Sequence, residues 1–303
     1  MKKYRQMDKN NENKKDGMTM NKNIAVITGT STGLGLGVSK VLAEAGWKVY
    51  ATMRNLKKGT PVKELQQKGL DIELLQLDVQ SQASVDQAVQ TVIDREDRID
   101  LFINNAGVGY VQNTEQSSEH DYQRIFDINT YGQIRCTKAV LPHMREQRAG
   151  RIVSISSVGG LVGQPMNEIY CASKFALEGY YESLATYVTP YFGVEFMIVE
   201  PGGISSEFAK SVLSDIENKG GFPKDAYEPV LNDYMSQRDH HDSGVFQTPE
   251  EIAEIMLMEL EKDTLPLRMR TSEWSEEFTK LKTSADPTGL KQTAMVTSSL
   301  LGK

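Results

Sequence analysis

The chain has 303 residues, of which 39% are hydrophobic and 25% charged, as in an ordinary globular protein with one sizeable core. Its net charge of -7 lacks the basic footprint of a protein that binds nucleic acid or an anionic membrane surface, and no apolar run approaches the ~18 residues of a membrane span. We therefore expect no nucleic-acid partner and no membrane span.

The two cysteines, Cys136 and Cys171, fall in helical patterns rather than at spacings typical of disulfides or zinc sites. This favours free thiols in a reducing cytoplasm. Residues 1–22 are rich in lysine and asparagine and lack an apolar core, which predicts a disordered leader rather than a secretory signal. A start misassigned upstream of Met18 or Met20 is the alternative. Residues 23–270 are expected to form one domain, and residues 271–303 a tail with a short helix.

The first predicted elements form a nucleotide-binding opening. Asn23–Thr28 predicts a strand, GTSTGLGLG a turn, and Val38–Ala45 an amphipathic helix that Gly46 ends. Glycines let a backbone approach a pyrophosphate at a helix N-terminus, although the spacing here is G-x-x-x-G-x-G rather than G-x-G-x-x-G. A glycine-rich turn alone is a weak signal. The residues expected to contact the phosphates are Gly29, Ser31, Thr32, Gly33, Leu34 and Gly35.

Cofactor preference is predicted from the end of the second strand, Lys48–Thr52. In dinucleotide-binding folds an acid about twenty residues past the glycine turn receives the ribose hydroxyls of NAD, whereas an arginine suits the 2′-phosphate of NADP. Met53 and Arg54 stand there, followed by Lys57 and Lys58. The position therefore predicts NADP(H), the alternative being a solvated basic loop.

The next elements set the fold class. Ile72–Leu77 predicts a strand, Ser81–Arg95 a capped helix, and Ile99–Ile103 another strand. Strands that alternate with helices predict an α/β fold: a single doubly wound, Rossmann-type parallel sheet with helices on both faces. Asp121–Met144 reads as one long helix that contains Asn129. A polar Asn inside a helix must have its amide satisfied, so an exposed or capped Asn is the simpler interpretation from the pattern alone.

A proton-transfer pair is predicted between Arg151 and Leu184. Tyr170 and Lys174 are four residues apart and share one helix face, and a nearby ammonium favours the phenolate. Alone, Y-x-x-x-K is a pattern that also arises by chance. Ser157, however, closes a buried strand and points toward the crevice where α/β sheets bind ligands. The neighbouring Cys171 is expected to be a small packing residue.

The S-V-G-G and Y-C-A-S-K-F-A-L-E-G segments closely resemble the short-chain dehydrogenase/reductases, most of all the branch with hydroxysteroid and retinol dehydrogenases. The glycine spacing and Asn104–Gly107, which matches the family's N-N-A-G, support this resemblance over about Asn23–Met269. It implies that Tyr170 is the acid/base, that Ser157 orients the substrate oxygen, and that Lys174 lowers the Tyr pKa and binds the nicotinamide ribose. Asn129 would support proton supply.

The resemblance also implies further cofactor contacts. Asp78 and Val79 would lie at the adenine, and other residues would line the pocket near the nicotinamide. Ser206 stands where the family usually has Thr, so its assignment is less direct. The remaining implied contacts are Asn105, Ala106, Gly107, Pro201, Gly202 and Ile204.

The last third of the domain is expected to cover the substrate. After a strand at Val194–Val199, residues 207–247 show no long regular period but contain Phe208, Phe222, Tyr227, Tyr234 and Phe246. Such an insertion predicts a binding loop or lid, the alternative being a surface loop without ligand contacts. A helix from Thr248 to Leu260 and a strand at Leu265–Met269 follow.

The sequence thus predicts an NADP(H)-dependent enzyme that interconverts an alcohol and a ketone or aldehyde on an apolar small molecule, without a metal. The four histidines offer no convincing metal set. A non-catalytic, redox-responsive NADP(H)-binding protein is the alternative function. The family resemblance implies a homodimer or homotetramer that pairs through the long helices around Asn129 and Tyr170.

Overall fold

Seven parallel strands form one sheet in the order β3-β2-β1-β4-β5-β6-β9. The computed structural model describes residues 22–205, 212, 214, 216–217, 221–222, 224–240 and 246–301. The chain runs outward from β1 to β3 and then returns to β4, so the winding reverses between β1 and β4. The strands are β1 Ile24–Thr28, β2 Lys48–Met53, β3 Ile72–Gln76, β4 Leu101–Asn104, β5 Gly150–Ile155, β6 Val194–Glu200 and β9 Arg268–Arg270.

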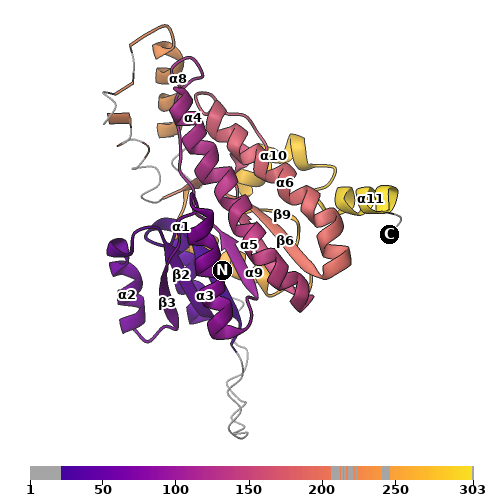
Figure 1. The fold of residues 1–303 in the computed structure, drawn as a ribbon. Helices are drawn as coiled ribbons and strands as arrows, with labels where there is room; N and C mark the ends of the chain where they lie inside the picture. Colours follow the sequence, from indigo (N-terminus) through magenta and orange to yellow (C-terminus); the bar gives the residue numbers. More distant parts are fainter. Residues whose placement is uncertain are drawn as a thin grey trace, which may run out of the picture.

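Helices cover both faces of the sheet (Figure 1). On one face, apolar side chains of α1 (Gly33–Glu44), α2 (Thr60–Gln67) and α9 (Pro249–Leu260) pack against the strands. On the other face, α3 (Gln82–Glu96), α5 (Gly132–Gln147) and α6 (Glu168–Phe192) do the same. All residues of β1 and β4 are buried, as expected for central strands covered on both sides. The predicted doubly wound parallel sheet is confirmed.

The predicted long helix at Asp121–Met144 is interrupted. A capping box at Ser118 starts α4 (Glu119–Phe126), a π-helical turn spans Asp127–Tyr131, and α5 continues to Gln147. The expectation of one regular helix is therefore wrong at its centre. The π-helical turn contains Asn129, whose side chain bonds to a neighbouring loop, and such turns occur frequently at functional sites.

The C-terminal third holds more helix than predicted. The helix α8 (Glu228–His240) lies inside the segment 207–247, for which no regular period was expected. The tail forms two helices, α10 (Glu273–Thr283) and α11 (Leu290–Leu301), instead of one short helix. A small parallel pair is formed by β7 (Gly203–Ile204), which precedes the segment, and β8 (Phe246–Gln247) at the segment's end. The described residues also form short helices at Leu56–Lys58 and Val158–Gly160.

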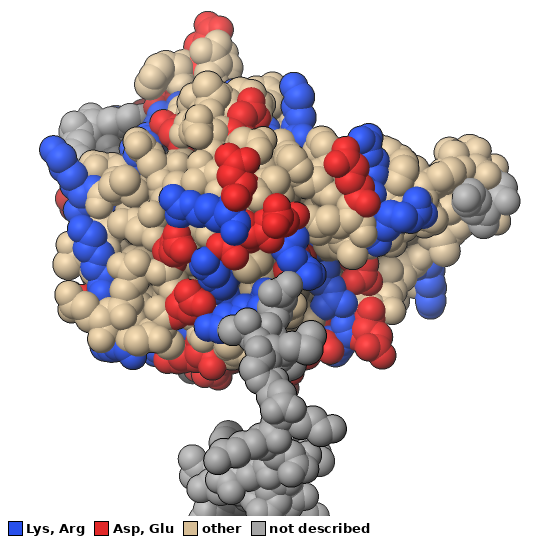
Figure 2. Space-filling model, turned by 60° about the horizontal axis from the view of Figure 1, so that its bottom comes forward, with Lys and Arg blue, Asp and Glu red and all other residues tan. Residues whose placement is uncertain are grey.

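Charges are interspersed on the face shown in Figure 2, which is the lower face of the view in Figure 1. Among the ion pairs of the described residues, Lys48 at the start of β2 lies 3.1 Å from the Glu73 carboxylate of β3. The leader prediction falls mostly on residues 1–21, outside the described residues, although Lys22 pairs with Asp71 at 2.9 Å. Cys136 and Cys171 are buried free thiols, as predicted. None of the described helices is both long and apolar enough to cross a membrane.

Candidate active site

An open cleft of about 2120 Å³ lies at the carboxyl ends of the strands, where the winding of the sheet reverses. A single small ligand occupies a pocket of roughly 300–1,000 Å³, so this cleft has room for a dinucleotide and a second molecule. Most of the predicted cofactor residues line it. These are Gly29, Ser31, Thr32, Gly33, Leu34, Arg54, Asp78, Val79, Asn105, Ala106, Gly107, Pro201, Gly202 and Ile204.

The glycine turn is held against the chain that follows β4. Gly29 has φ +72°, and a Cβ built on it would lie 2.8 Å from Ala106 Cα, so both the conformation and the space require glycine. The Asn105 amide donates to the carbonyl oxygens of Thr28 at 2.8 Å and Gly29 at 3.0 Å. Gly35 lies outside the cleft lining and allows α1 to pack beside Asn105. The glycine turn and the N-terminus of α1 therefore line the cleft, and the backbone there is open to a ligand.

At the far end of the cleft lies Arg54, directly after β2. Its side chain is exposed, and Nη1 donates to Gln80 Oε1 over a long 3.4 Å. Gln80 Nε2 in turn donates to Asp127 Oδ2 at 2.9 Å. Lys58 also lines this end. The guanidinium is thus weakly held within the protein and can turn toward a ligand.

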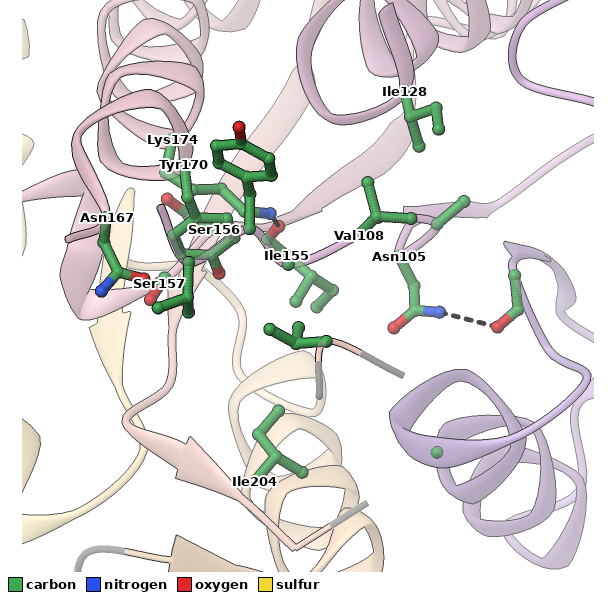
Figure 3. A pocket seen from close by; sticks show the side chains of 18 of the residues that line it. Asn105, Val108, Ile128, Ile155, Ser156, Ser157, Asn167, Tyr170, Lys174 and Ile204 are labelled. Carbon is green, nitrogen blue, oxygen red and sulfur yellow. Dashed lines mark hydrogen bonds between the residues drawn. The ribbon is translucent and has the colours of Figure 1, made fainter. Parts of the chain in front are cut away.

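The structure brings Ser157, Tyr170 and Lys174 together on one wall of the cleft (Figure 3). Ser157 lies two residues after the end of β5, and its Oγ accepts a hydrogen bond from the backbone N of Gly159 at 3.0 Å. Tyr170 and Lys174 come from the first two turns of α6. Lys174 Nζ donates to the carbonyl oxygen of Ile155 at 2.9 Å and lies 5.8 Å from the centre of the Tyr170 ring.

Burial shifts the pKa values of Tyr170 and Lys174 in opposite directions. Burial raises the pKa of Tyr170 to about 12, and a hydrogen bond with Ser157 opposes that rise. Burial also lowers the pKa of Lys174 to about 8, which the Glu178 carboxylate opposes. Desolvation dominates the pKa of Tyr170, and the Lys174 ammonium bonds to the Ile155 carbonyl, so the lowering of the Tyr170 pKa by Lys174 stays a prediction.

Asn129 is fully buried next to this wall, with 0% exposure. Its Oδ1 accepts from Val108 N at 2.8 Å, while its Nδ2 donates to Val108 O at 2.9 Å and Ser173 Oγ at 3.2 Å. A Cβ on Gly107 would lie 3.3 Å from Asn129 Oδ1 and 3.7 Å from Lys174 Nζ. The amide is therefore satisfied, and it and the lysine both lie close to Gly107, which excludes the alternative of an exposed or capping Asn.

Aromatic side chains from the C-terminal third of the chain line the outer part of the cleft, among them Trp274 and Phe278, which no sequence motif assigns to a site. Trp274 and Phe278 of α10 stack with ring centres 4.8 Å apart and line the cleft. Asn167 before α6 donates to Tyr234 Oη of α8 at 3.2 Å. The aromatic pair was predicted only as part of the tail, and no local motif links it to Ser157. Ser206, the last predicted cofactor residue, lies outside the described residues.

Over most of its length, the chain is similar to known proteins of one family. A family model described as short chain dehydrogenase matches residues 23–217. Retinol dehydrogenase 8 of Bos taurus is 37% identical over 87% of this chain and 86% of its own length. 17-beta-hydroxysteroid dehydrogenase type 1 of Homo sapiens is 35% identical over 89% of this chain and 83% of its own. A solved short-chain dehydrogenase from Streptomyces avermitilis superposes with a TM-score of 0.74 at 26% identity, covering 93% of this chain and 99% of its own.

Proposed function

This chain belongs to the short-chain dehydrogenase family, and from that premise we propose that it is an NADP(H)-dependent oxidoreductase that interconverts an alcohol and a ketone or aldehyde on an apolar small molecule. One observation carries the proposal. Ser157, Tyr170 and Lys174 converge in the same cleft as the glycine turn at the N-terminus of α1. A proton donor, an orienting hydroxyl and a phosphate-binding turn therefore share one space.

The residues present fit a nicotinamide dinucleotide. The glycine turn offers close backbone approach and a helix N-terminus for the pyrophosphate, and Lys174 would hold the ribose near the nicotinamide. When bound, the nicotinamide supplies the hydride in reduction and accepts it in oxidation. The protein's task is to position the substrate carbon and to exchange the proton.

In the reduction direction, the substrate oxygen would lie between the hydroxyls of Ser157 and Tyr170. Ser157 donates a hydrogen bond that polarises the carbonyl, and Tyr170 gives its proton to the oxygen as the carbon receives the hydride. The product is the alcohol, and Tyr170 is left as a phenolate. The raised pKa of Tyr170 keeps the proton on the phenol until it is needed, which suits an acid in reduction.

We assign the return of the proton to Tyr170 to a path that passes Lys174. The pKa of Lys174, lowered to about 8, brings its ammonium close to the pH at which proton exchange is efficient. Asn129 and Lys174 both lie close to Gly107, and the Asn129 amide bonds to the backbone of Val108. We assign Asn129 to the support of this proton path.

Arg54 supports the choice of NADP(H). The Arg54 side chain is exposed at the cleft, and a guanidinium can form charge-assisted bonds to a 2′-phosphate. Lys58 adds a second positive charge at the same end. Asp78 also lines the cleft, but it follows β3. An acid that selects NAD would stand directly after β2, where this chain has Arg54.

An apolar substrate is supported by the outer cleft. The lining there includes Val162 and the stacked pair Trp274 and Phe278. Two relatives carry the names of retinol and hydroxysteroid dehydrogenases, which fits a substrate with a large apolar body. The test is oxidation of NADPH with a panel of hydrophobic ketones and aldehydes. No turnover of any member, together with tight NADPH binding, would favour a redox-responsive binding protein instead.

A homodimer or homotetramer is part of the proposal. Large side chains stand exposed along the helices from α4 to α6, among them Tyr122, Tyr131, Phe175 and Tyr187. Pairing of two copies through these helices would cover such side chains. Small-angle scattering at working concentration would show a particle of at least two chains, whereas a monomer throughout would contradict this part of the proposal.

A further inference from the structure

A buried group of charges lies directly behind the wall that carries Ser157. It consists of Glu178 in α6, Glu200 at the end of β6, and Arg268 and Arg270 in β9. Arg268 Nε lies 3.1 Å from Glu178 Oε2 and 3.6 Å from Glu200 Oε1, and Arg270 Nη1 donates to Glu200 Oε2 at 3.1 Å. Buried ion pairs are weak sources of stability because desolvation offsets their attraction. Because these ion pairs lie beside the reacting groups, we ask whether they serve the reaction rather than stability.

Glu178 contacts the turn that carries Ser157. Ser156 Oγ donates to Glu178 Oε1 at 2.6 Å, one residue before Ser157. At the other end of the turn, a Cβ built on Gly160 would lie 2.6 Å from Ser156 Oγ and 2.9 Å from Glu178 Oε1. The carboxylate therefore packs against both ends of the turn, and Ser157 stands between them.

From these contacts we propose that Glu178 is a positioning residue, whose carboxylate fixes the Ser156–Gly160 turn and with it the direction of the Ser157 hydroxyl. This inference rests on the proposed function, in which Ser157 orients the substrate oxygen. Arg268 holds the carboxylate from the opposite side. Because the family model matches residues 23–217, Arg268 and Arg270 belong to a part of the chain beyond that match.

A second effect follows from the position of Glu178 one helical turn after Lys174. The Glu178 carboxylate opposes the desolvation that lowers the pKa of Lys174, and so favours its ammonium form. Burial raises the pKa of Glu178 and Glu200 alike, but that of Glu200 lies well above its ordinary value because the Glu178 carboxylate adds to the burial.

Other charges around Glu178 must be considered in any test. Glu182, one turn further along α6, also pairs with Arg268, and its side chain is 32% exposed. Lys282 and Asp286 line a smaller cavity that adjoins Glu178. Glu182 is the matched control, because Glu182→Gln removes a carboxylate from the same arginine without a contact to Ser156.

The experiment compares Glu178→Gln, Ser156→Ala and Glu182→Gln with the wild type, after thermal melts have shown which variants are folded. Amide hydrogen exchange of the 156–161 segment is measured first, since it requires no substrate. We expect Glu178→Gln and Ser156→Ala to exchange roughly tenfold faster there, because the turn loses a hydrogen bond to a charged group, and Glu182→Gln to match the wild type. Ser156→Ala keeps every charge in place and tests the hold on the turn even where Glu178→Gln does not fold.

Kinetics then test the consequence for the reaction. We expect Glu178→Gln to lower kcat roughly tenfold with the KM for NADPH within about twofold, and to move the high-pH limb of kcat to lower pH. Ser156→Ala should lower kcat without moving that limb. Unchanged exchange and kcat in both variants, or equal losses in Glu182→Gln, would overturn the inference. A wild type that turns over no carbonyl compound would instead overturn the proposed function, while the exchange data would still decide whether Glu178 holds the turn.

Discussion

Lys174 Nζ donates a hydrogen bond to the backbone carbonyl oxygen of Ile155 at 2.9 Å. This bond joins the second turn of α6 to the end of β5, two residues before Ser157. It therefore fixes the distance between the two elements that supply the hydroxyl and the phenol. It also directs the ammonium into the wall of the cleft, which explains why burial, rather than a contact with Lys174, dominates the pKa of Tyr170.

Lys174→Ala should weaken NADPH binding and lower kcat together, because the proposal gives this ammonium two tasks. The variant also removes the shorter of two side-chain hydrogen bonds to the Ile155 carbonyl and leaves only the 3.4 Å bond from Gln133 Nε2, at a cost of about 0.5–1.5 kcal/mol in the free energy of unfolding. Fluorescence titration with NADPH and steady-state kinetics separate the tasks. An unchanged Kd for NADPH in a folded variant would remove the ribose-binding role.

The rate of reduction should depend on the charge of Lys174. Its pKa is lowered to about 8, so the ammonium is present below this pH and is lost as the pH rises through it. We expect kcat for reduction to fall above a pH of about 8. Lys174→Arg is the control, because a guanidinium stays protonated and should abolish this limb whatever the residual rate. A limb at the same pH in the Arg variant would assign the titration to another group.

Asn129→Ala should destabilise the protein and slow turnover. The substitution leaves both the N–H and the carbonyl of Val108 without their side-chain partner in a buried place, which costs about 1–3 kcal/mol for each unsatisfied group. Denaturant unfolding measures the loss of stability, and kcat measures the effect on the proton path. Wild-type stability would show that the loop at Val108 does not depend on the amide.

Cofactor preference can be tested at Arg54 alone. Met53 is 3% exposed and packs in the core, so an aspartate there would bury a charge and confuse the result. Arg54→Ala should reduce the ratio of kcat/KM for NADPH to that for NADH by roughly ten- to hundred-fold, the value of a well-formed bond to a charged group. Lys57→Ala is the control, because Lys57 is exposed but does not line the cleft. This variant should leave the ratio of the two kcat/KM values unchanged. Wild-type enzyme that uses both cofactors equally well would contradict the preference.

The sequence predicts best what is local. The glycine turn and the pair Tyr170 and Lys174 are recognisable because short spacings fix their geometry, and the alternation of strands with helices is sufficient for the sheet. The π-helical turn at Asn129 is not predictable from periodicity, and the partner of the Asn129 amide, Val108, lies 21 positions away in the chain. The partnership of Glu178 and Arg268 spans 90 positions and depends on where β9 joins the sheet.

The same limit explains the outer cleft. Trp274 and Phe278 carry no motif, and they reach the cleft only because α10 folds back after β9. The helix α8 was not predicted because its apolar residues follow no clear helical period, whereas Tyr234 within it contacts Asn167 in space. Assignments that depend on tertiary packing thus require the structure.

The most direct test compares the wild type with Tyr170→Phe in one assay of NADPH oxidation with hydrophobic ketones and aldehydes. The substitution removes the proton that the proposal transfers and keeps the ring. We expect turnover by the wild type, and a loss of about 100- to 10,000-fold in kcat with little change in NADPH binding for the variant. A Tyr170→Phe variant with near wild-type kcat would contradict the assignment of Tyr170 as the acid that completes carbonyl reduction.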